Sequence, residues 1–479
     1  MPQPDKTNVL LIGSGGREHA LAWKLRQSPD LGDLYTDSPK NPGLAKLCKP
    51  ADVQVVGSDT FMLENFCTKN RIGLVVIGPE EPLAKGYTDV LLGLRSPGEG
   101  IILQKPRAGM SALEATSLVN TQAVLHAPTS HVFGPLKAGA KLEADKAFSK
   151  DLMRSAAIPT AEARTFNDYH AAKEYVLSRK EAPVIKASGL AKGKGVFVPA
   201  NHEEADTALQ RIMLKREFGD AGNTVVIEER LKGREVSVFA VMDGRNILLL
   251  DPCQDHKRLH DGARGPNTGG MGALCPTTAI DDRTMDRVLR EILIPTADAL
   301  RREGIDYRGV LYAGLMLTHA GPKVLEYNVR FGDPECQALM MRLNTDLLKL
   351  MLAAAEGGGK ADGSTSKAAQ GLEAIEIGKP LGVSVCVVLA APGYPDNPKK
   401  GVPITGVEKA EQVPGVQIFH AGTAIDDQNR LVTAGGRVLC VTAIGPTAEH
   451  ARTQAYAAAD MIHFEGKLMR RDIGTDIVG

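Results

Sequence analysis

The amino-acid sequence predicts an α/β fold whose N-terminal part is a doubly wound parallel sheet. Residues 8–12 and 74–77 are short, continuous apolar runs, the pattern of strands that are covered on both faces. A Gly-rich turn follows the first run, and a segment with helical apolar spacing, residues 20–25, follows the turn. Strand, turn and helix in this order are typical of a parallel sheet with crossover helices.

Length and composition describe a globular chain with several cores. At roughly 100 to 200 residues per domain, 479 residues predict about three domains. Aromatic residues make up 4% of the chain, too few for base-stacking platforms. Lys plus Arg and Asp plus Glu both number 57, so no net charge attracts nucleic acid or an anionic membrane. A local anion site is still compatible with this balance.

The seven cysteines are scattered, and no pair has Cys-x-x-Cys spacing, which argues against a zinc site and a disulfide framework. We expect buried thiols in a reducing compartment. The first residues contain no apolar leader segment, and no later run is long enough to cross a membrane. These features predict a cytoplasmic protein.

Three polar turns follow extended segments of the N-terminal part: residues 13–19, 41–43 and 78–82. In a doubly wound sheet such turns gather at the carboxyl edge of the strands, where ligands bind. The first turn presents backbone amides and Arg17 to an anion, but Glu18 stands where a dinucleotide fingerprint has its third glycine and would repel a pyrophosphate. Each turn could also be a plain strand-to-helix corner.

A basic, Gly-rich hairpin, residues 187–196, follows a predicted strand that ends at Lys186. Mobile amides and ammonium groups suit a lid over a triphosphate, although the Gly-Lys-Ser/Thr ending of a Walker loop is missing. Ahead of it, Lys146, Lys150 and Arg154 share one helical face. A Gly-rich hairpin without a ligand remains the alternative. Residues 97–130 show no clear strand and helix alternation and predict a surface insertion.

Residues 323–335 predict a strand that breaks into a loop at a Gly and a Pro. Glu326, Asn328 and Arg330 lie two apart and project from one face. A carboxylate, an amide oxygen and a guanidinium can together hold a magnesium ion and a phosphoryl group. An exposed face with a solvated ion pair is the alternative.

Motifs in this order resemble those of the glycinamide ribonucleotide synthetase (phosphoribosylamine–glycine ligase) family. They are Gly-Gly-Arg-Glu-His-Ala at 15–20, Gly-Pro-Glu at 78–80, the 186–196 lid, Gln-Asp-His-Lys-Arg at 254–258, Gly-Pro-Asn-Thr-Gly-Gly-Met-Gly at 265–272 and Glu-x-Asn-x-Arg-Phe-Gly-Asp-Pro-Glu at 326–335. The resemblance covers nearly the whole chain. It implies an ATP-grasp enzyme that joins glycine to 5-phosphoribosylamine and cleaves ATP to ADP and phosphate, with Mg²⁺ or Mn²⁺ as cofactor.

The resemblance also implies roles for individual residues. The expected metal ligands are Glu326 and Asn328, and the residues expected around glycine and its activated form are Asp255, Lys257, Arg330 and Asp333. The expected ATP-binding residues are Lys146, Lys186, Gly189, Lys192, Gly193, Gly195, Glu228, Glu229, Leu231 and Glu235, with residues 228–231 as the adenine hinge and Glu235 on the ribose. The expected substrate pocket contains Gly15, Gly16, Arg17, Asn41, Gly43, Gly78, Pro79, Glu80, Asn267, Gly269 and Gly270.

The sequence departs from the family pattern in two places. Many ATP-grasp enzymes have a further metal carboxylate on the strand before Glu-x-Asn, but residues 312–317 contain none. Residues 97–130 are also longer than expected at that point.

The expected domains are an N-terminal domain (1–140), an ATP-grasp core (141–355) with a mobile lid (160–230), a Gly-rich linker (356–380) and a small C-terminal α/β domain (381–479). The expected partners are small-molecule substrates, without nucleic acid or membrane, and the chain is expected to be a monomer. A sister ATP-grasp enzyme that activates bicarbonate or formate is the alternative function. A nucleotide-sensing module without turnover is disfavoured, because Lys146, Lys186, Glu326 and Asn328 are all present.

Overall fold

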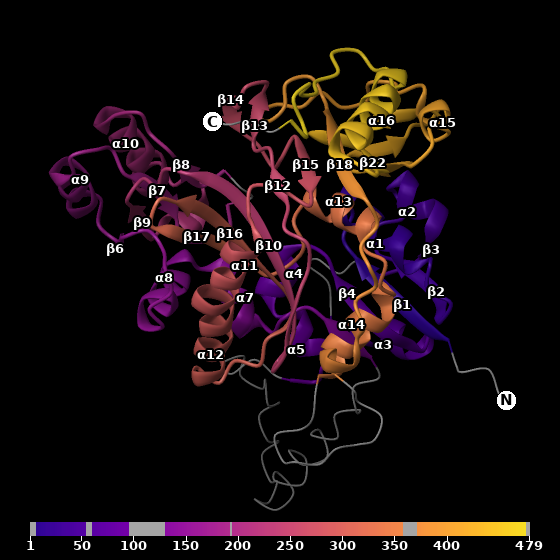
Figure 1. Cartoon of the computed structure of the whole chain (residues 1–479), viewed down its shortest axis with the longest axis horizontal. Helices are drawn as coiled ribbons and strands as arrows, with labels where there is room; N and C mark the ends of the chain where they lie inside the picture. The colour runs from indigo at the N-terminus through magenta and orange to yellow at the C-terminus, as the bar shows by residue number, and fades with distance from the viewer. Residues whose placement is uncertain (1–5, 54–59, 95–129, 192–193, 358–370, 476–479) are drawn as a thin grey trace, which may run out of the picture.

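The computed structural model describes residues 6–53, 60–94, 130–191, 194–357 and 371–475. In Figure 1 the N-terminal part lies at the lower right, the C-terminal part above it and the lid at the upper left, with a long antiparallel sheet between them. The expected insertion (97–130) lies almost wholly outside the described ranges, as do Lys192, Gly193 and part of the expected linker. No helix in the described ranges is long and apolar enough to cross a membrane.

The N-terminal domain contains the predicted parallel sheet, in the order β3-β2-β1-β4-β5. The chain winds outward from β1 in both directions, so the doubly wound prediction is confirmed. The turns after β1 and β4 lie side by side, because the Gly78 amide donates to the Ile12 carbonyl at 3.0 Å. The strands are Thr7–Ile12, Leu31–Thr36, Lys49–Pro50, Ile72–Ile77 and His131–Phe133, and helices α1 to α5 are Gly16–Leu25, Pro42–Leu47, Thr60–Lys69, Glu80–Lys85 and Tyr87–Leu91.

The central sheet is antiparallel, in the order β11-β10-β16-β17. Alternate residues of β10 enter opposite cores, as the period of two requires: Val238 and Ala240 on one face, Phe239 and Val241 on the other. The first of these cores also contains Leu10 and other residues of the N-terminal sheet, so the two domains share a core. The strands are Arg234–Asp243, Ile247–Leu249, Arg308–Thr318 and Gly321–Asn328, and the helices are α7 (Lys137–Ala144), α8 (Lys146–Ser155), α11 (Asp282–Val288), α12 (Ile294–Arg302) and α14 (Leu347–Glu356).

The expected lid has a sheet and a core of its own. The sheet order is β6-β9-β7-β8, and a separate cluster with Ile185, Leu209 and Ile227 packs between the sheet and its helices. A subdomain that shares little core with its neighbours can move as a unit, as a lid must, and its mobility stays a prediction. Its elements are β6 (Ala163–Phe166), α9 (Tyr169–Ser178), β7 (Val184–Ala187), β8 (Val196–Phe197), α10 (His202–Leu209) and β9 (Val225–Glu228).

The C-terminal sheet includes two strands from the expected ATP-grasp core, which the sequence did not predict. β12 and β15 come from residues 254–275 and complete the order β12-β15-β18-β22-β19. These strands are too short to predict from periodicity, since each pairs over only two to four residues. The elements are β12 (Gln254–Asp255), β13 (Arg258–His260), β14 (Arg264–Asn267), β15 (Gly272–Cys275), α13 (Glu335–Arg342), β18 (Val383–Ala390), α15 (Val407–Ala410), β19 (Val416–His420), β20 (Thr423–Ile425), β21 (Leu431–Thr433), β22 (Arg437–Gly445) and α16 (Ala448–Met461).

Two buried histidines join the N-terminal and C-terminal domains. The His420 backbone amide donates to Nδ1 of His19 at 2.8 Å, and the ring of His19 lies edge-on to Phe419 at 5.5 Å. Burial lowers the pKa of His19 to about 3 and that of His420 to about 4, and the nearby Lys46 also lowers both values. Both imidazoles are therefore neutral in the folded protein at neutral pH.

We expect this interface to be weakened by acid. Below pH ~6.5 the unfolded chain binds a proton at each of these histidines while the folded chain does not, so the free energy of unfolding falls toward pH ~4 with a slope of up to about 1.4 kcal/mol per pH unit per histidine. The check is the urea midpoint between pH 7.5 and 4.5 for the native chain, for His19→Gln with His420→Gln, and for His450→Gln at an exposed position as control. An unchanged pH slope in the double variant would contradict this assignment.

Candidate active site

A cavity of about 470 Å³ lies among residues of the lid, the central sheet, the N-terminal domain and the C-terminal domain. Its size is in the usual range for small-ligand sites. Residues from distant parts of the sequence meet there, which a plain surface strand would not require. The predicted residues that line it are Arg17, Pro79, Glu80, Lys146, Lys186, Gly195, Glu228, Asp255, Lys257, Gly269, Glu326, Asn328, Arg330 and Asp333.

The expected metal ligands both lie on β17 and line the cavity. In the sheet, Glu326 stands opposite Gly314 and Asn328 opposite Tyr312, so β16 offers no carboxylate beside either of them. Within the described ranges no group of three or more Asp, Glu, His or Cys residues is arranged to hold a metal ion. One carboxylate and one amide oxygen fit a Mg²⁺ that takes its other ligands from phosphates and water.

Glu326 is ionised despite its position inside the protein. Burial raises the pKa of its carboxyl group, but Lys257, Lys186 and Lys146 outweigh burial and hold the pKa below its usual value. Glu326 thus presents a negative carboxylate to several cations. Such an arrangement suits a metal bound to an anionic ligand.

The two expected phosphate-binding lysines approach the cavity from different elements. Lys186 on β7 donates to the Leu325 carbonyl at 3.0 Å and pairs with Glu228 at 2.9 Å. Lys146, at the start of α8, donates to the Gly189 carbonyl of the lid loop at 3.4 Å. Burial lowers the pKa of Lys146, which the nearby Glu326 opposes. Both ammonium groups are held by the protein before any anion arrives.

Lys150 is a cavity residue that the sequence analysis did not assign. It lies one helical turn after Lys146, donates to Thr160 at 2.7 Å and pairs with Glu228 at 3.2 Å. Burial lowers the pKa of Lys150 to about 8. The i, i+4 spacing of the two lysines was the available signal. The Glu228 carboxylate therefore forms ion pairs with two buried lysines. In this conformation only the backbone of Glu228 could act in the expected adenine hinge.

Arg330 connects the expected metal ligands to the N-terminal domain. It pairs with Glu143 at 2.7 Å and with Glu80 at 3.4 Å, and it donates to the Asn328 side-chain oxygen at 3.2 Å. Glu143 also accepts from the Val329 amide at 2.8 Å, which fixes the end of β17. No sequence motif indicated Glu143, because its partner lies 187 residues away.

Asp255, expected near glycine, has a buried oxygen without a hydrogen-bond partner in the described structure. Burial, followed by the nearby Glu335, raises its pKa well above the usual value. Glu335 accepts from the hydroxyl groups of Tyr312 at 2.8 Å and Ser237 at 3.1 Å. Lys257 pairs with Glu235 at 3.0 Å. The negative charge of Glu235 contributes most to raising the pKa of Lys257 above its usual value. Glu235 was expected to bind the ribose of ATP. To do so it would have to leave its ion pair with Lys257.

The C-terminal domain adds Arg437, another residue that the sequence analysis missed. Arg437 donates to the Gly269 carbonyl at 2.6 Å and to the Asp333 carbonyl, and it pairs with the Asp333 carboxylate at 3.3 Å. Burial raises the pKa of Asp333, but Arg437 and Arg17 lower it below its usual value. Arg437 stands at the start of a strand without a motif, so the sequence carried no signal for it.

Several expected substrate-pocket residues are used by the fold instead of lining the cavity. Asn41 caps α2 and donates to carbonyls of Ser14, His420 and Ala421. A Cβ atom on Gly43 would lie 2.1 Å from His19. The remaining expected residues that do not line the cavity are Gly15, Gly16, Gly78, Gly189, Glu229, Leu231, Glu235, Asn267 and Gly270.

The comparison with known proteins agrees with this arrangement. The N domain, the ATP-grasp (A) domain and the C domain of phosphoribosylglycinamide synthetase match residues 7–114, 144–336 and 384–476. The chain belongs to the phosphoribosylglycinamide synthetase family. It is therefore an ATP-grasp enzyme and a ligase of purine biosynthesis, as the sequence predicted. The N-domain match runs to residue 114, so part of the expected insertion (97–130) belongs to the family pattern.

Members of the phosphoribosylglycinamide synthetase family align with nearly the whole chain. Phosphoribosylamine–glycine ligase of Rhodopirellula baltica is 44% identical and covers 98% of this chain and 97% of its own. The trifunctional purine biosynthetic protein adenosine-3 of Gallus gallus is 43% identical over 97% of this chain, which spans 42% of that longer protein. The crystal structure of phosphoribosylamine–glycine ligase from Thermotoga maritima is 33% identical, has a TM-score of 0.75 and covers 97% of this chain and 100% of its own.

More distant solved structures share the fold alone. Biotin carboxylase from Campylobacter jejuni is 14% identical, with a TM-score of 0.63 over 97% of this chain and 93% of its own. At that identity the likeness does not favour the alternative in which bicarbonate is activated.

Proposed function

We propose that this chain joins glycine to 5-phosphoribosylamine and cleaves ATP to ADP and phosphate, giving glycinamide ribonucleotide. One observation carries the proposal: a single cavity holds Lys146 and Lys186, the oxygen pair Glu326 and Asn328, and Arg17 and Glu80 from the N-terminal domain. A triphosphate, a metal ion and a sugar-phosphate amine can meet there. The monomeric state and the cytoplasmic location expected from the sequence belong to the same proposal.

The ATP phosphates would lie between the two lysines and β17. Lys146 on α8 and Lys186 on β7 would neutralise the phosphate charge, and Gly195 of the Gly-rich hairpin lines the same cavity. Glu326 and Asn328 would hold Mg²⁺, which when bound neutralises the developing charge on the transferred phosphoryl group. The protein positions the reactants before any charge develops.

Glycine would bind beside Asp255, Lys257, Arg330 and Asp333. A carboxylate is a poor acyl donor, so a glycine oxygen first attacks the γ-phosphorus and releases ADP. The resulting glycyl phosphate has a good leaving group. The amine of phosphoribosylamine, held from the side of Arg17 and Glu80, then attacks the acyl carbon, loses a proton and displaces phosphate.

The test is ADP release with each substrate omitted in turn. Freshly made phosphoribosylamine and glycine should together stimulate ADP release, and bicarbonate or formate in place of glycine should not. Stimulation by bicarbonate or formate would support the sister-enzyme alternative. The absence of turnover with every acid would support a nucleotide-sensing module.

A further inference from the structure

The turn between β1 and α1 has the form of a phosphate site but is filled by the protein itself. A Gly-rich turn ahead of a helix normally presents backbone amides to an anion. Here the Gly13 amide donates to the Asp37 carboxylate at 3.0 Å, and the Gly15 amide donates to Oε2 of Glu18 at 2.6 Å. Two carboxylates thus occupy two of the amides that a phosphate at this turn would use.

Glu18 lies inside the turn, with a side chain only 2% exposed. A Cβ atom on Gly78 would lie 2.1 Å from its Oε1, and one on Gly13 would lie 2.7 Å from its Cγ. Gly13 and Gly78, in the turns after β1 and β4, therefore leave space for the Glu18 side chain. This space alone explains why these positions are glycine, without a bound ligand. A second anion in the same place would be repelled.

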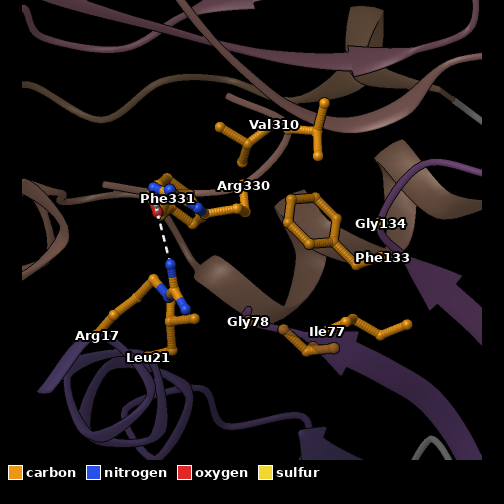
Figure 2. Close-up of a pocket in the computed structure, with 11 residues that line it drawn as sticks. Arg17, Leu21, Ile77, Gly78, Phe133, Gly134, Val310, Arg330 and Phe331 are labelled. Atoms are coloured by element: carbon orange, nitrogen blue, oxygen red, sulfur yellow. Dashed lines mark hydrogen bonds between the residues drawn. The ribbon is translucent and has the colours of Figure 1, made fainter. Parts of the chain in front are cut away.

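The second oxygen of Glu18 holds Arg17. Arg17 Nε lies 2.6 Å from Oε1 of Glu18, and Arg17 Nη1 donates to the Phe331 carbonyl at 3.1 Å. Arg330 donates to the same carbonyl at 3.2 Å. Figure 2 shows Arg17 extending from α1 toward Phe331 and Arg330, and these three residues line a small cavity of about 10 Å³. Arg17 also lines the large cavity, and Glu18 and Phe331 fix the orientation of its guanidinium.

We propose that Glu18 is a positioning residue: it closes the Gly-rich turn to phosphate and fixes Arg17 as the group of this turn that meets the sugar phosphate. The inference rests on the proposed function, which places phosphoribosylamine on this side of the cavity. It changes the expected recognition, because the backbone amides of Gly13 and Gly15 then make no phosphate contact. The sugar phosphate is instead bound by the Arg17 guanidinium, whose paired N–H donors match the geometry of a phosphate group.

The test is the binding of ribose 5-phosphate, a stable relative of the substrate, to the full-length chain by calorimetry. Glu18→Gln keeps the size of the side chain and one acceptor for the Gly15 amide but no longer attracts Arg17. We expect it to weaken ribose 5-phosphate binding by about tenfold or more, with ATP binding and the KM values for ATP and glycine within about twofold. Glu449→Gln, in the first turn of α16, is the matched control and should change none of these values.

Glu18→Ala separates the two possible roles of the turn. If it binds ribose 5-phosphate or inorganic phosphate more tightly than the native chain, the turn itself is the phosphate site and the proposal is overturned. Unchanged ribose 5-phosphate affinity in both variants, with a lower melting temperature, would show that Glu18 acts only as a helix cap. That result would also overturn the proposal. Both results can occur in a chain that still releases ADP with glycine and phosphoribosylamine, so they leave the proposed function standing.

Discussion

Glu326→Gln is expected to lower kcat by at least about 100-fold at saturating Mg²⁺ while the protein stays folded. Glu326 is the carboxylate of the oxygen pair on β17, and β16 offers no other beside it. Removing a single preorganised oxyanion-hole donor commonly costs about 10² to 10³ in kcat, and we expect the loss of a metal-binding carboxylate to cost a similar factor. The substitution keeps the shape of the side chain, so the loss would reflect charge.

The measurement is steady-state ADP release over a Mg²⁺ titration, with circular dichroism and the melting temperature as checks of folding. Glu303→Gln, at an exposed position after α12, serves as the control and should retain full activity. Activity within about twofold of the native chain for Glu326→Gln would contradict the assignment of the metal ligand.

Glu228→Gln is expected to destabilise the lid by about 3 kcal/mol, because it leaves two buried cations without their shared carboxylate. The side chains of Lys150 and Lys186 are 4% and 6% exposed and lie 3.2 and 2.9 Å from Glu228. The effect should be local, since the lid has its own core. Amide exchange in β7 and β9 should quicken by roughly a hundredfold, while exchange in β1 and β4 stays unchanged.

A second substitution checks the cause. Adding Lys150→Met to Glu228→Gln removes one of the two unpaired charges and should recover part of the lost protection. Unchanged exchange in Glu228→Gln would show that these lysines do not depend on Glu228, and equal exchange in the single and double variants would point to another cause.

The sequence predicted those parts of the fold and the site that depend on local pattern. The parallel N-terminal sheet followed from apolar runs and Gly-rich turns, and the pair Glu326 and Asn328 followed from the period of a strand. Lys150 could have been predicted as a cavity residue, because it lies one helical turn from Lys146. These features need only neighbours within a few residues.

Features that depend on distant pairing could not be read from the sequence. Glu143 and Arg437 reach the cavity through partners far away in the chain, and β15 pairs with β18 across 109 residues, from Cys275 to Ser384. The Gly-rich turn is the most instructive case. Its pattern indicated an anion site, and Glu18 was recognised as a barrier to pyrophosphate, but only the folded structure places that carboxylate inside the turn.

The most direct test of the proposed chemistry follows one oxygen atom. If glycine is activated as an acyl phosphate, one of its carboxylate oxygens must leave with the phosphate when the amine attacks. Glycine labelled with oxygen-18 in its carboxylate should therefore deliver one labelled oxygen to inorganic phosphate per turnover, measured by mass spectrometry, and only when ATP, glycine and phosphoribosylamine are all present. Unlabelled phosphate from a productive reaction would contradict the two-step mechanism, because neither phosphorylation of the sugar amine nor separate ATP hydrolysis moves that oxygen.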